Sequence, residues 1–373
     1  MIQAVVKKEL RQIIRDTRTL GVLLFVPVFL LVMFGYAISL DVKNAPITVV
    51  DHDKSRQSRE LIRGFSHSEY FDLAYFTDDT GQLESMFLDE AVQGALVIPG
   101  NFSKRILRGE DTTVQVLIDG TNGTTGSALL GYMQAVIINY AGSLQEARLG
   151  VETTELLPID YRPRVWFNPE LESNQYLIPG LVAFILVVTA VISTALSVVR
   201  EKELGTLEQI AASPLRPVDL ILGKTLPYMV ISAVIAASVF VASYFFFDVG
   251  VAGSLLWLGG VTLLFLFACL GLGIFISSIA ETQQVAFLIA ILSTFLPSFI
   301  LSGFVFPIEN MPVLIQAATY LVPARYYLSA LRAIMLKGAG VMVFWPDVLL
   351  LAIFAAATVG AGIFRLRTRS VLA

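Results

Sequence analysis

Few side chains in this 373-residue chain are of the types that carry acid–base, redox or metal chemistry. The chain has two histidines and one cysteine. The run Asp51-His52-Asp53 offers three metal-ligating side chains, but adjacent residues rarely converge on one ion and no partner cluster accompanies them. We therefore interpret the run as a polar turn after a strand. Cys269 lies in an apolar run, and the chain has no second cysteine with which it could form a disulfide.

Nucleophilic and nucleotide chemistry are equally poorly supported. Ser55 and Ser58 have no histidine at the spacing of a hydrolase motif. Residues 223–225 carry the lysine and threonine of a phosphate-binding loop, but residues 217–222 lack its first glycine. The sequence therefore predicts no catalytic residue, no metal site, no cofactor bound by this chain and no nucleotide hydrolysis by it.

The composition is that of a membrane protein. Hydrophobic residues make up 55% of the chain and charged residues 15%, whereas about 25% of an average globular chain is charged. Mean hydropathy is +0.73. So few charges would not cover a water-soluble surface, but lipid solvates apolar faces. The net charge of −4 gives no reason to expect nucleic-acid binding.

Six segments are long and apolar enough to cross a bilayer, which takes about 20 apolar residues. We predict a polytopic α-helical membrane protein with six transmembrane helices and an α/β extracytoplasmic domain between the first and the second. The predicted spans are 21–40, 174–199, 226–247, 254–280, 282–306 and 347–364.

Lysines and arginines predict the orientation of these spans. They gather in residues 1–20, in the loop 200–225 and in the tail 365–373, which lie on one side if six spans are counted. Basic flanks mark the cytoplasmic side. Residues 1–20 place apolar side chains near helical spacing between the charges, which indicates an amphipathic helix on the cytoplasmic membrane surface.

The segment 41–173 then lies outside the cytoplasm. It holds 11 basic and 20 acidic residues, so the negative charge of the chain lies there. Short alternating apolar runs such as 47–50 and 71–76 indicate strands, and residues such as 55–65 between them look helical. Strands alternating with helices predict a small α/β domain.

Residues 307–337 follow the fifth span and contain two apolar stretches that are too short to cross a membrane. We expect a pair of short helices that dip into the outer face of the membrane, or one surface helix in an external loop. An arginine that faces lipid alone is costly, so the arginines here should lie in protein or near headgroups. The candidate residues for an outer gate are Pro307, Pro323, Arg325 and Arg332.

The cytoplasmic loop is the most specific feature of the sequence. It reads REKELGTLEQIAASPLRP over residues 200–217, followed by LGKTLPY over 222–228. This pattern resembles the signature of the ABC-2 type transporter permeases, the membrane subunits of ATP-binding-cassette exporters. The runs VVDHDKSRQSRELI (49–62) and FVFPIENMP (304–312) resemble the bacterial multidrug-type branch, so the likeness covers nearly the whole chain.

The resemblance implies a permease subunit in a bacterial cell inner membrane, with both termini cytoplasmic and membrane lipid around it. It implies two copies of a cytoplasmic ATPase, a second permease subunit that is identical or paralogous, and in some members a periplasmic membrane-fusion adaptor. The implied cargo is small, amphipathic and drug-like, and nucleic acid is not a partner. The residues implied to couple this chain to the ATPase are Glu201, Glu203, Gly205, Thr206, Glu208, Gln209 and Pro214.

Two other classes of function remain open from the residues alone. One is a membrane-anchored sensor of an extracytoplasmic ligand, but the cytoplasmic segments are too short for a signalling domain. The other is a secondary transporter, which usually places ionisable residues inside its spans. The six predicted spans hold essentially none, which favours energy that arrives from a separate ATPase.

Overall fold

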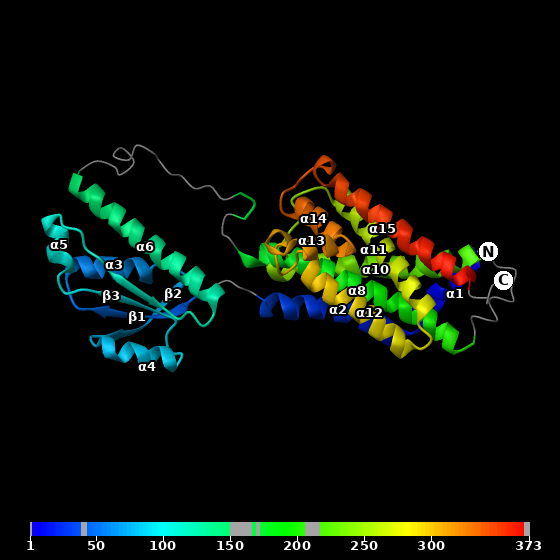
Figure 1. The fold of residues 1–373 in the computed structure, drawn as a ribbon, viewed down its shortest axis with the longest axis horizontal. Helices are drawn as coiled ribbons and strands as arrows, with labels where there is room; N and C mark the ends of the chain where they lie inside the picture. Colours follow the sequence, from blue (N-terminus) through cyan, green and yellow to red (C-terminus); the bar gives the residue numbers. More distant parts are fainter. Residues whose placement is uncertain (1, 39–42, 150–165, 169–171, 206–216, 369–373) are drawn as a thin grey trace. The chain divides into compact units, whose positions relative to one another are not determined.

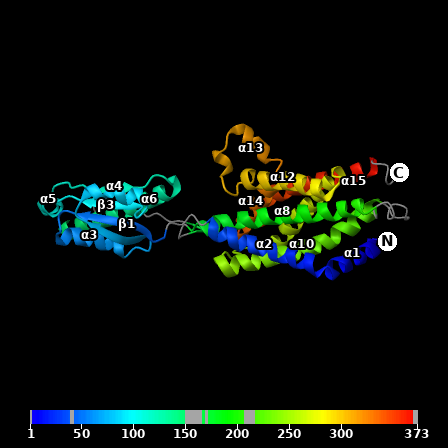
Figure 2. The ribbon, with the colours of Figure 1, turned by 90° about the horizontal axis from the view of Figure 1, so that it is seen from below.

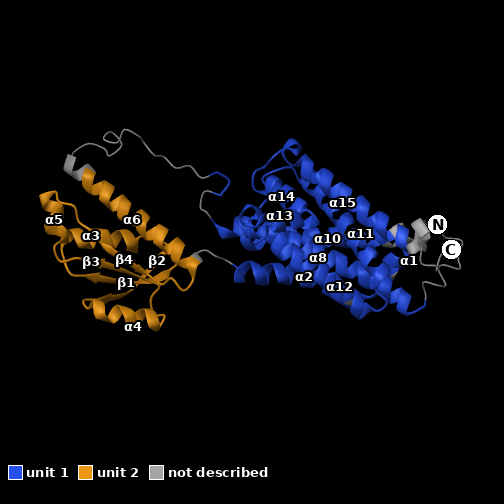
Figure 3. Cartoon of the chain, viewed as in Figure 1, with its two compact units in different colours: residues 1–39, 165–373 blue, residues 40–164 orange. Residues whose placement is uncertain are grey.

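The computed structural model describes residues 2–38, 43–149, 166–168, 172–205 and 217–368. These residues form two compact units (Figure 3). The first, here called the helical unit, comprises residues 1–39 and 165–373. The second, here called the α/β unit, comprises residues 40–164.

The helical unit contains the apolar segments of the sequence. Among the described residues, six of its helices are long and apolar enough to cross a membrane, which is the number that the sequence predicts. Its helices are α1 (Ile2–Arg15), α2 (Thr17–Ala37), α8 (Ser173–Glu203), α10 (Pro217–Phe247), α11 (Leu255–Ile279), α12 (Gln283–Leu301), α13 (Val313–Thr319), α14 (Pro323–Met335) and α15 (Val341–Thr368).

Helix α8 is largely buried and packs against α2, α10, α11, α12 and α14 (Figures 1 and 2). Small residues let its neighbours approach closely, as in other membrane helix pairs. A Cβ atom added to Gly273 of α11 would lie 2.8 Å from the Cβ of Thr194 on α8. A Cβ added to Gly180 of α8 would lie 2.2 Å from the ring of Phe304, which is buried.

The segment predicted to hold two short helices does contain them, and they differ in burial. Most of α14 is buried, and its Tyr327 stacks on Phe265 with ring centroids 4.0 Å apart. The Tyr327 hydroxyl also lies 2.9 Å from that of Thr262. By contrast, α13 exposes its apolar side chains, and Leu314 is 87% exposed. The short helix α14 therefore belongs to the core of the helical unit.

The last spanning helix begins earlier than the sequence suggests. We expected a span over 347–364, but α15 begins at Val341. Pro346 therefore lies inside the helix instead of in its first turn, at the expense of one backbone hydrogen bond. Asp347 also lies beyond the first turn, because α15 begins six residues before it. Its carboxylate accepts a hydrogen bond of 2.7 Å from the Ser329 hydroxyl of α14.

The α/β unit is a four-stranded sheet with helices on both faces. The strand order is β2-β1-β3-β4, with β2, β1 and β3 parallel and β4 antiparallel to β3. Its elements are β1 (Ala45–Asp51), α3 (Arg56–Ser66), β2 (Phe71–Thr77), η1 (Thr80–Gln82), α4 (Leu83–Leu88), β3 (Gly94–Ile98), α5 (Phe102–Arg108), β4 (Gln115–Ile118) and α6 (Gly123–Leu149).

Side chains of the central strand β1 point alternately to the two faces of the sheet and contribute to a hydrophobic core on each face. Ile47 and Val49 point to the face that α3, α5 and α6 cover, and Val50 points to the face that α4 covers. Ser55 caps the N-terminus of α3, because its side chain accepts a hydrogen bond from the backbone N–H of Ser58 at 3.1 Å. Strand β2 lies at one edge of the sheet.

The contact between Gly180 and Phe304 gives a test of the packing. The substitution Gly180→Val should lower the thermal unfolding midpoint of the purified protein by several degrees, because overpacking a core costs about 1–3 kcal/mol. Gly259→Val on α11 is the matched control, since no heavy atom of the described residues lies within 4 Å of a Cβ added there. Equal midpoints for the two variants would contradict the packing.

Candidate functional site

Four consecutive charged residues, 200–203, end helix α8 at the same end of the helical unit as α1 and the C-terminal end of α15 (Figures 1 and 2). We call this region the charged end. Its residues are Lys8, Glu9, Arg200, Glu201, Lys202 and Glu203.

The first contact at the charged end joins α8 to α1. Lys8 donates a hydrogen bond of 2.9 Å to Glu201 and one of 3.2 Å to Glu9. Glu9 is only 3% exposed and Glu201 only 7%, whereas the Lys8 side chain is half-exposed. Lys8 therefore lies between two buried carboxylates, and removing its charge would leave both of them less well compensated.

Electrostatics keep this ammonium group charged. Burial acts to lower the pKa of Lys8, but the hydrogen bond and the charge of Glu201, with a contribution from Glu9, outweigh it and raise the pKa above 10.5. A raised lysine pKa stabilises the fold below the unfolded-state pKa, and this stabilisation is lost as the pH rises through the folded-state pKa. The contact between α1 and α8 is therefore fully formed at neutral pH.

Two further contacts join the same end of α8 to α11 and α12. Lys202 donates a hydrogen bond of 2.7 Å to the carbonyl oxygen of Ala280, the residue that ends α11. Glu203 accepts a hydrogen bond of 2.7 Å from the backbone N–H of Gln283, the first residue of α12, and another from its side-chain amide. One turn of α8 is therefore tied to α1, α11 and α12 by three neighbouring side chains.

A cavity of about 610 Å³ extends from the charged end between α1, α2, α8 and α10. Its walls are mostly apolar and are provided by α2 and α8, with hydroxyl groups of α8 among them. The charged side chains of α1 and α8 lie at its polar end. Residues that line it include Lys8, Glu9, Val26, Leu30, Thr189, Ile192, Ser193, Arg200, Glu201 and Tyr228.

The opposite end of α8 is held by Arg332 of α14. Its guanidinium donates hydrogen bonds of 3.0 Å to the carbonyl oxygen of Gly303 and of 3.1 Å to that of Tyr176, in the first turn of α8. It also stacks over the Tyr176 ring, 3.7 Å from the centroid. The Tyr176 hydroxyl donates to the same Gly303 carbonyl at 3.2 Å. Arg332 therefore connects α14, α8 and the segment after α12.

Comparison with known proteins identifies the kind of molecule that carries these features. The model of a family described as ABC-2 family transporter protein matches residues 18–364. The chain belongs to this ABC-2 family. The probable multidrug ABC transporter permease YbhS of Escherichia coli K12 is 34% identical over 369 residues, which are 99% of this chain and 96% of the relative.

Two other relatives of the ABC-2 chain are similar along most of its length. The probable multidrug ABC transporter permease YbhR of the same strain is 29% identical over 367 residues, or 98% of each chain. ABC transporter G family member 20 of Dictyostelium discoideum is 25% identical over 348 residues, which are 90% of this chain and 46% of the relative. Family membership indicates a multi-pass membrane permease subunit and implies a partner ATP-binding-cassette ATPase.

The residues predicted to couple this ABC-2 permease to an ATPase fall in three groups. Glu201 and Glu203 have the partners within the chain described above. Gly205 follows α8 with a left-handed φ of +68°, which favours glycine, and among the described residues a Cβ there would meet no atom within 4 Å. Thr206, Glu208, Gln209 and Pro214 lie outside the described residues. The coupling role of the whole set stays a prediction.

The four residues predicted as an outer gate all lie between α12 and the end of α14. Pro307 precedes the short helix η2 (Ile308–Asn310), and Pro323 is the buried first residue of α14. Arg325 donates a hydrogen bond to the Thr319 hydroxyl and lies 3.9 Å from the centroid of the Tyr320 ring. Both arginines therefore contact protein groups, as expected for arginines beside an apolar segment, and their role in gating stays a prediction.

Sequence reasoning missed Lys8, Glu9 and the lining of the cavity. Thr189, Ser193 and Ser197 recur every four residues, so they share one face of α8. A row of hydroxyl groups on one face of an otherwise apolar helix indicates that this face borders a cavity. The partners of Lys8 could not be read in this way, because Glu201 is 193 residues away in the chain.

The shared ammonium group gives a test of the charged end. Lys8→Glu should lower the free energy of unfolding by about 1–2 kcal/mol, less than the full cost of breaking a buried pair because the lysine is half-exposed. Adding Glu201→Lys should restore part of the loss, since a cation again lies among carboxylates. Thermal or denaturant unfolding of the purified protein measures both effects.

Lys7→Glu is the matched control for this test, because Lys7 is the exposed neighbour of Lys8 on α1. It makes the same change in net charge and should leave stability nearly unchanged. An equal loss for Lys7→Glu and Lys8→Glu, without recovery in the exchanged pair, would show that the contact contributes nothing.

Proposed function

We propose that this chain is the membrane-spanning permease subunit of an ATP-driven exporter. It moves small amphipathic, drug-like molecules out of the cytoplasm, and a separate cytoplasmic ATPase, present in two copies, hydrolyses the ATP. The names of YbhS and YbhR as probable multidrug ABC transporter permeases support this proposal. The single observation that carries it is the cavity beside α8.

The cavity suits an amphipathic molecule. Its volume of about 610 Å³ lies in the range of about 300–1,000 Å³ that small-molecule sites occupy. Val26, Leu30 and Ile192 provide apolar wall, while the hydroxyls of Thr189 and Ser193 and the groups of the charged end provide hydrogen bonds. An apolar body would pack along α2 and α8, with its polar group toward Lys8 and Glu201.

We propose that the charged end faces the cytoplasm of a bacterial cell, at its inner membrane. The lysines and arginines of 1–20, 200–225 and 365–373 support this orientation by the positive-inside rule. The segment 206–216 directly follows Gly205, so a partner that pushes on it acts on the end of α8. Because Glu201, Lys202 and Glu203 tie this end to α1, α11 and α12, the push reaches these helices together.

The other end of α8 then faces outward, and we propose that α14 closes the pathway there. Arg332 is bonded to the first turn of α8 and to the segment after α12, so movement of α8 changes the position of all three. Pro307, Pro323 and Arg325 hold the flanking turns. A second permease subunit, identical or paralogous, completes the pathway, and a periplasmic adaptor continues it in cells that supply one.

Filling the cavity tests its role in transport. Thr189→Trp should lower ATP-dependent uptake of fluorescent amphipathic dyes into inverted vesicles by about tenfold or more, since about 1.4 kcal/mol of lost binding is a factor of ten. Ser193→Leu, a smaller change in the same wall, should give a weaker loss. Co-purification of the partner ATPase should be unchanged, because Thr189 and Ser193 lie more than ten residues before segment 206–216.

Val241→Trp is the control, because Val241 is an exposed residue of α10 that does not line the cavity. Uptake that depends on ATP in the parent and the control but not in Thr189→Trp supports the proposal. Absence of ATP-dependent uptake of every dye, with the ATPase bound, would contradict the proposed cargo. Failure of any ATPase to co-purify would contradict the proposed energy source.

A further inference from the structure

A groove of about 480 Å³ lies in the α/β unit, between α3 and the edge strand β2. It opens where the parallel strands β1 and β2 end. Crevices at the carboxyl ends of parallel strands are common ligand sites in α/β folds. The groove is lined by Asp51, Lys54, Arg59, Ile62, Arg63 and Phe76.

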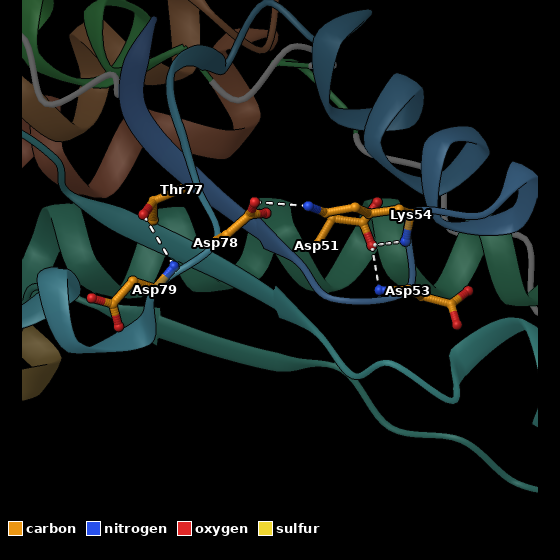
Figure 4. A network of polar contacts seen from close by, with 6 residues as sticks. All are labelled: Asp51, Asp53, Lys54, Thr77, Asp78 and Asp79. Carbon is orange, nitrogen blue, oxygen red and sulfur yellow. Dashed lines mark hydrogen bonds and ion pairs between the residues drawn. The ribbon is translucent and has the colours of Figure 1, made fainter.

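Hydrogen bonds fix the loop that forms one wall of this groove (Figure 4). Asp51 accepts bonds of 3.0 Å from the backbone N–H groups of Asp53 and Lys54, and one of 2.6 Å from the Ser58 hydroxyl. Lys54 reaches across to Asp78, after β2, with its ammonium 2.7 Å from the carboxylate. The only carboxylate in the groove lining is therefore already occupied by hydrogen bonds from its own loop.

Two arginines supply positive charge to the groove. Arg59 and Arg63 lie one turn apart on α3, and both are exposed. Within the described residues neither forms an ion pair, whereas Arg56 on the same helix is bound to Glu60 at 2.9 Å. The surrounding segment 41–173 carries 20 acidic and 11 basic residues. The groove is thus a local cationic site in an acidic domain.

The apolar part of the groove is also exposed. Phe76 is 64% exposed although it pairs with Val49, a residue of the core, across the two strands. Because β2 is an edge strand of the described sheet, Phe76 has a cross-strand neighbour on one side alone. Ile62 of α3 is partly buried and lies against the core of the unit. An apolar surface therefore lies beside the two arginines.

We propose that this groove binds a small anionic amphiphile. An acidic group, such as a carboxylate or a sulfonate, accepts hydrogen bonds from Arg59 and Arg63, and an aromatic or aliphatic body packs against Phe76 and Ile62. The volume of the groove lies in the range of about 300–1,000 Å³ for small-molecule sites. The proposal concerns the α/β unit alone and does not depend on transport through the helical unit.

The test is saturation-transfer NMR on the purified full-length chain in lipid nanodiscs, with naphthalene-2-sulfonate as the probe and empty nanodiscs as the blank. The parent should give a saturable signal that weakens as salt is added, because exposed charges are screened. The double substitution Arg59→Gln with Arg63→Gln should weaken binding by about tenfold, as expected for loss of charge-assisted hydrogen bonds. Phe76→Ala should also weaken it.

Two matched variants sharpen this test. Arg56→Gln removes a charge from the same helix outside the groove and should leave binding unchanged. Asp78→Asn removes the partner of Lys54 and should tighten binding. A naphthylmethylammonium probe should give no saturable signal.

Equal binding of the two probes, or equal binding by the parent and the double variant, would overturn the proposal. So would the absence of a saturable sulfonate signal at millimolar concentration in a folded parent. The assay contains neither ATPase nor ATP, so its outcome is separate from that of the transport experiments.

Discussion

Two carboxylates, Glu9 and Glu201, are buried side by side at one end of a helical bundle and share the single ammonium group of Lys8. Burying a charged carboxylate costs several kcal/mol unless other groups compensate it, and the ammonium group of Lys8 is one group that does so here. Lys8 and Glu9 belong to α1 and Glu201 to α8. The contact of Lys8 with these carboxylates therefore holds α1 against α8, in addition to the apolar packing between helices.

The other features of the helical unit are arranged along α8. At its charged end, Lys202 and Glu203 bind the end of α11 and the start of α12. At its other end, Arg332 binds its first turn to α14. Between the two ends, small residues bring α11 close, and the cavity opens on the side of α2. A helix held at both ends in this way moves its neighbours when it moves, as we propose for a permease driven by a cytoplasmic ATPase.

The sequence alone predicted the features that depend on local patterns and on residue types. Six apolar runs predicted six spanning helices, and the residues of loop 200–217 indicated the ABC-2 family that the comparisons then showed. The sequence alone could not predict contacts between segments that are far apart in the chain. The sequence placed Glu201 and Glu203 in the cytoplasmic loop, but the structure places them at the end of α8, where Lys8 and Gln283 bind them within the chain. The span predicted over 347–364 begins earlier in the structure, at Val341, because α15 accommodates Pro346 inside the helix.

We propose that the contact of Lys8 with Glu201 transmits the work of the ATPase to the helices around the cavity. ATP hydrolysis and dye transport, measured together in liposomes that contain the chain and its partner ATPase, test it most directly. For Lys8→Met we expect hydrolysis to continue while the number of dye molecules moved per ATP falls well below that of the parent. Lys7→Met should match the parent. A parental ratio of transport to hydrolysis in a folded Lys8→Met protein would contradict the account.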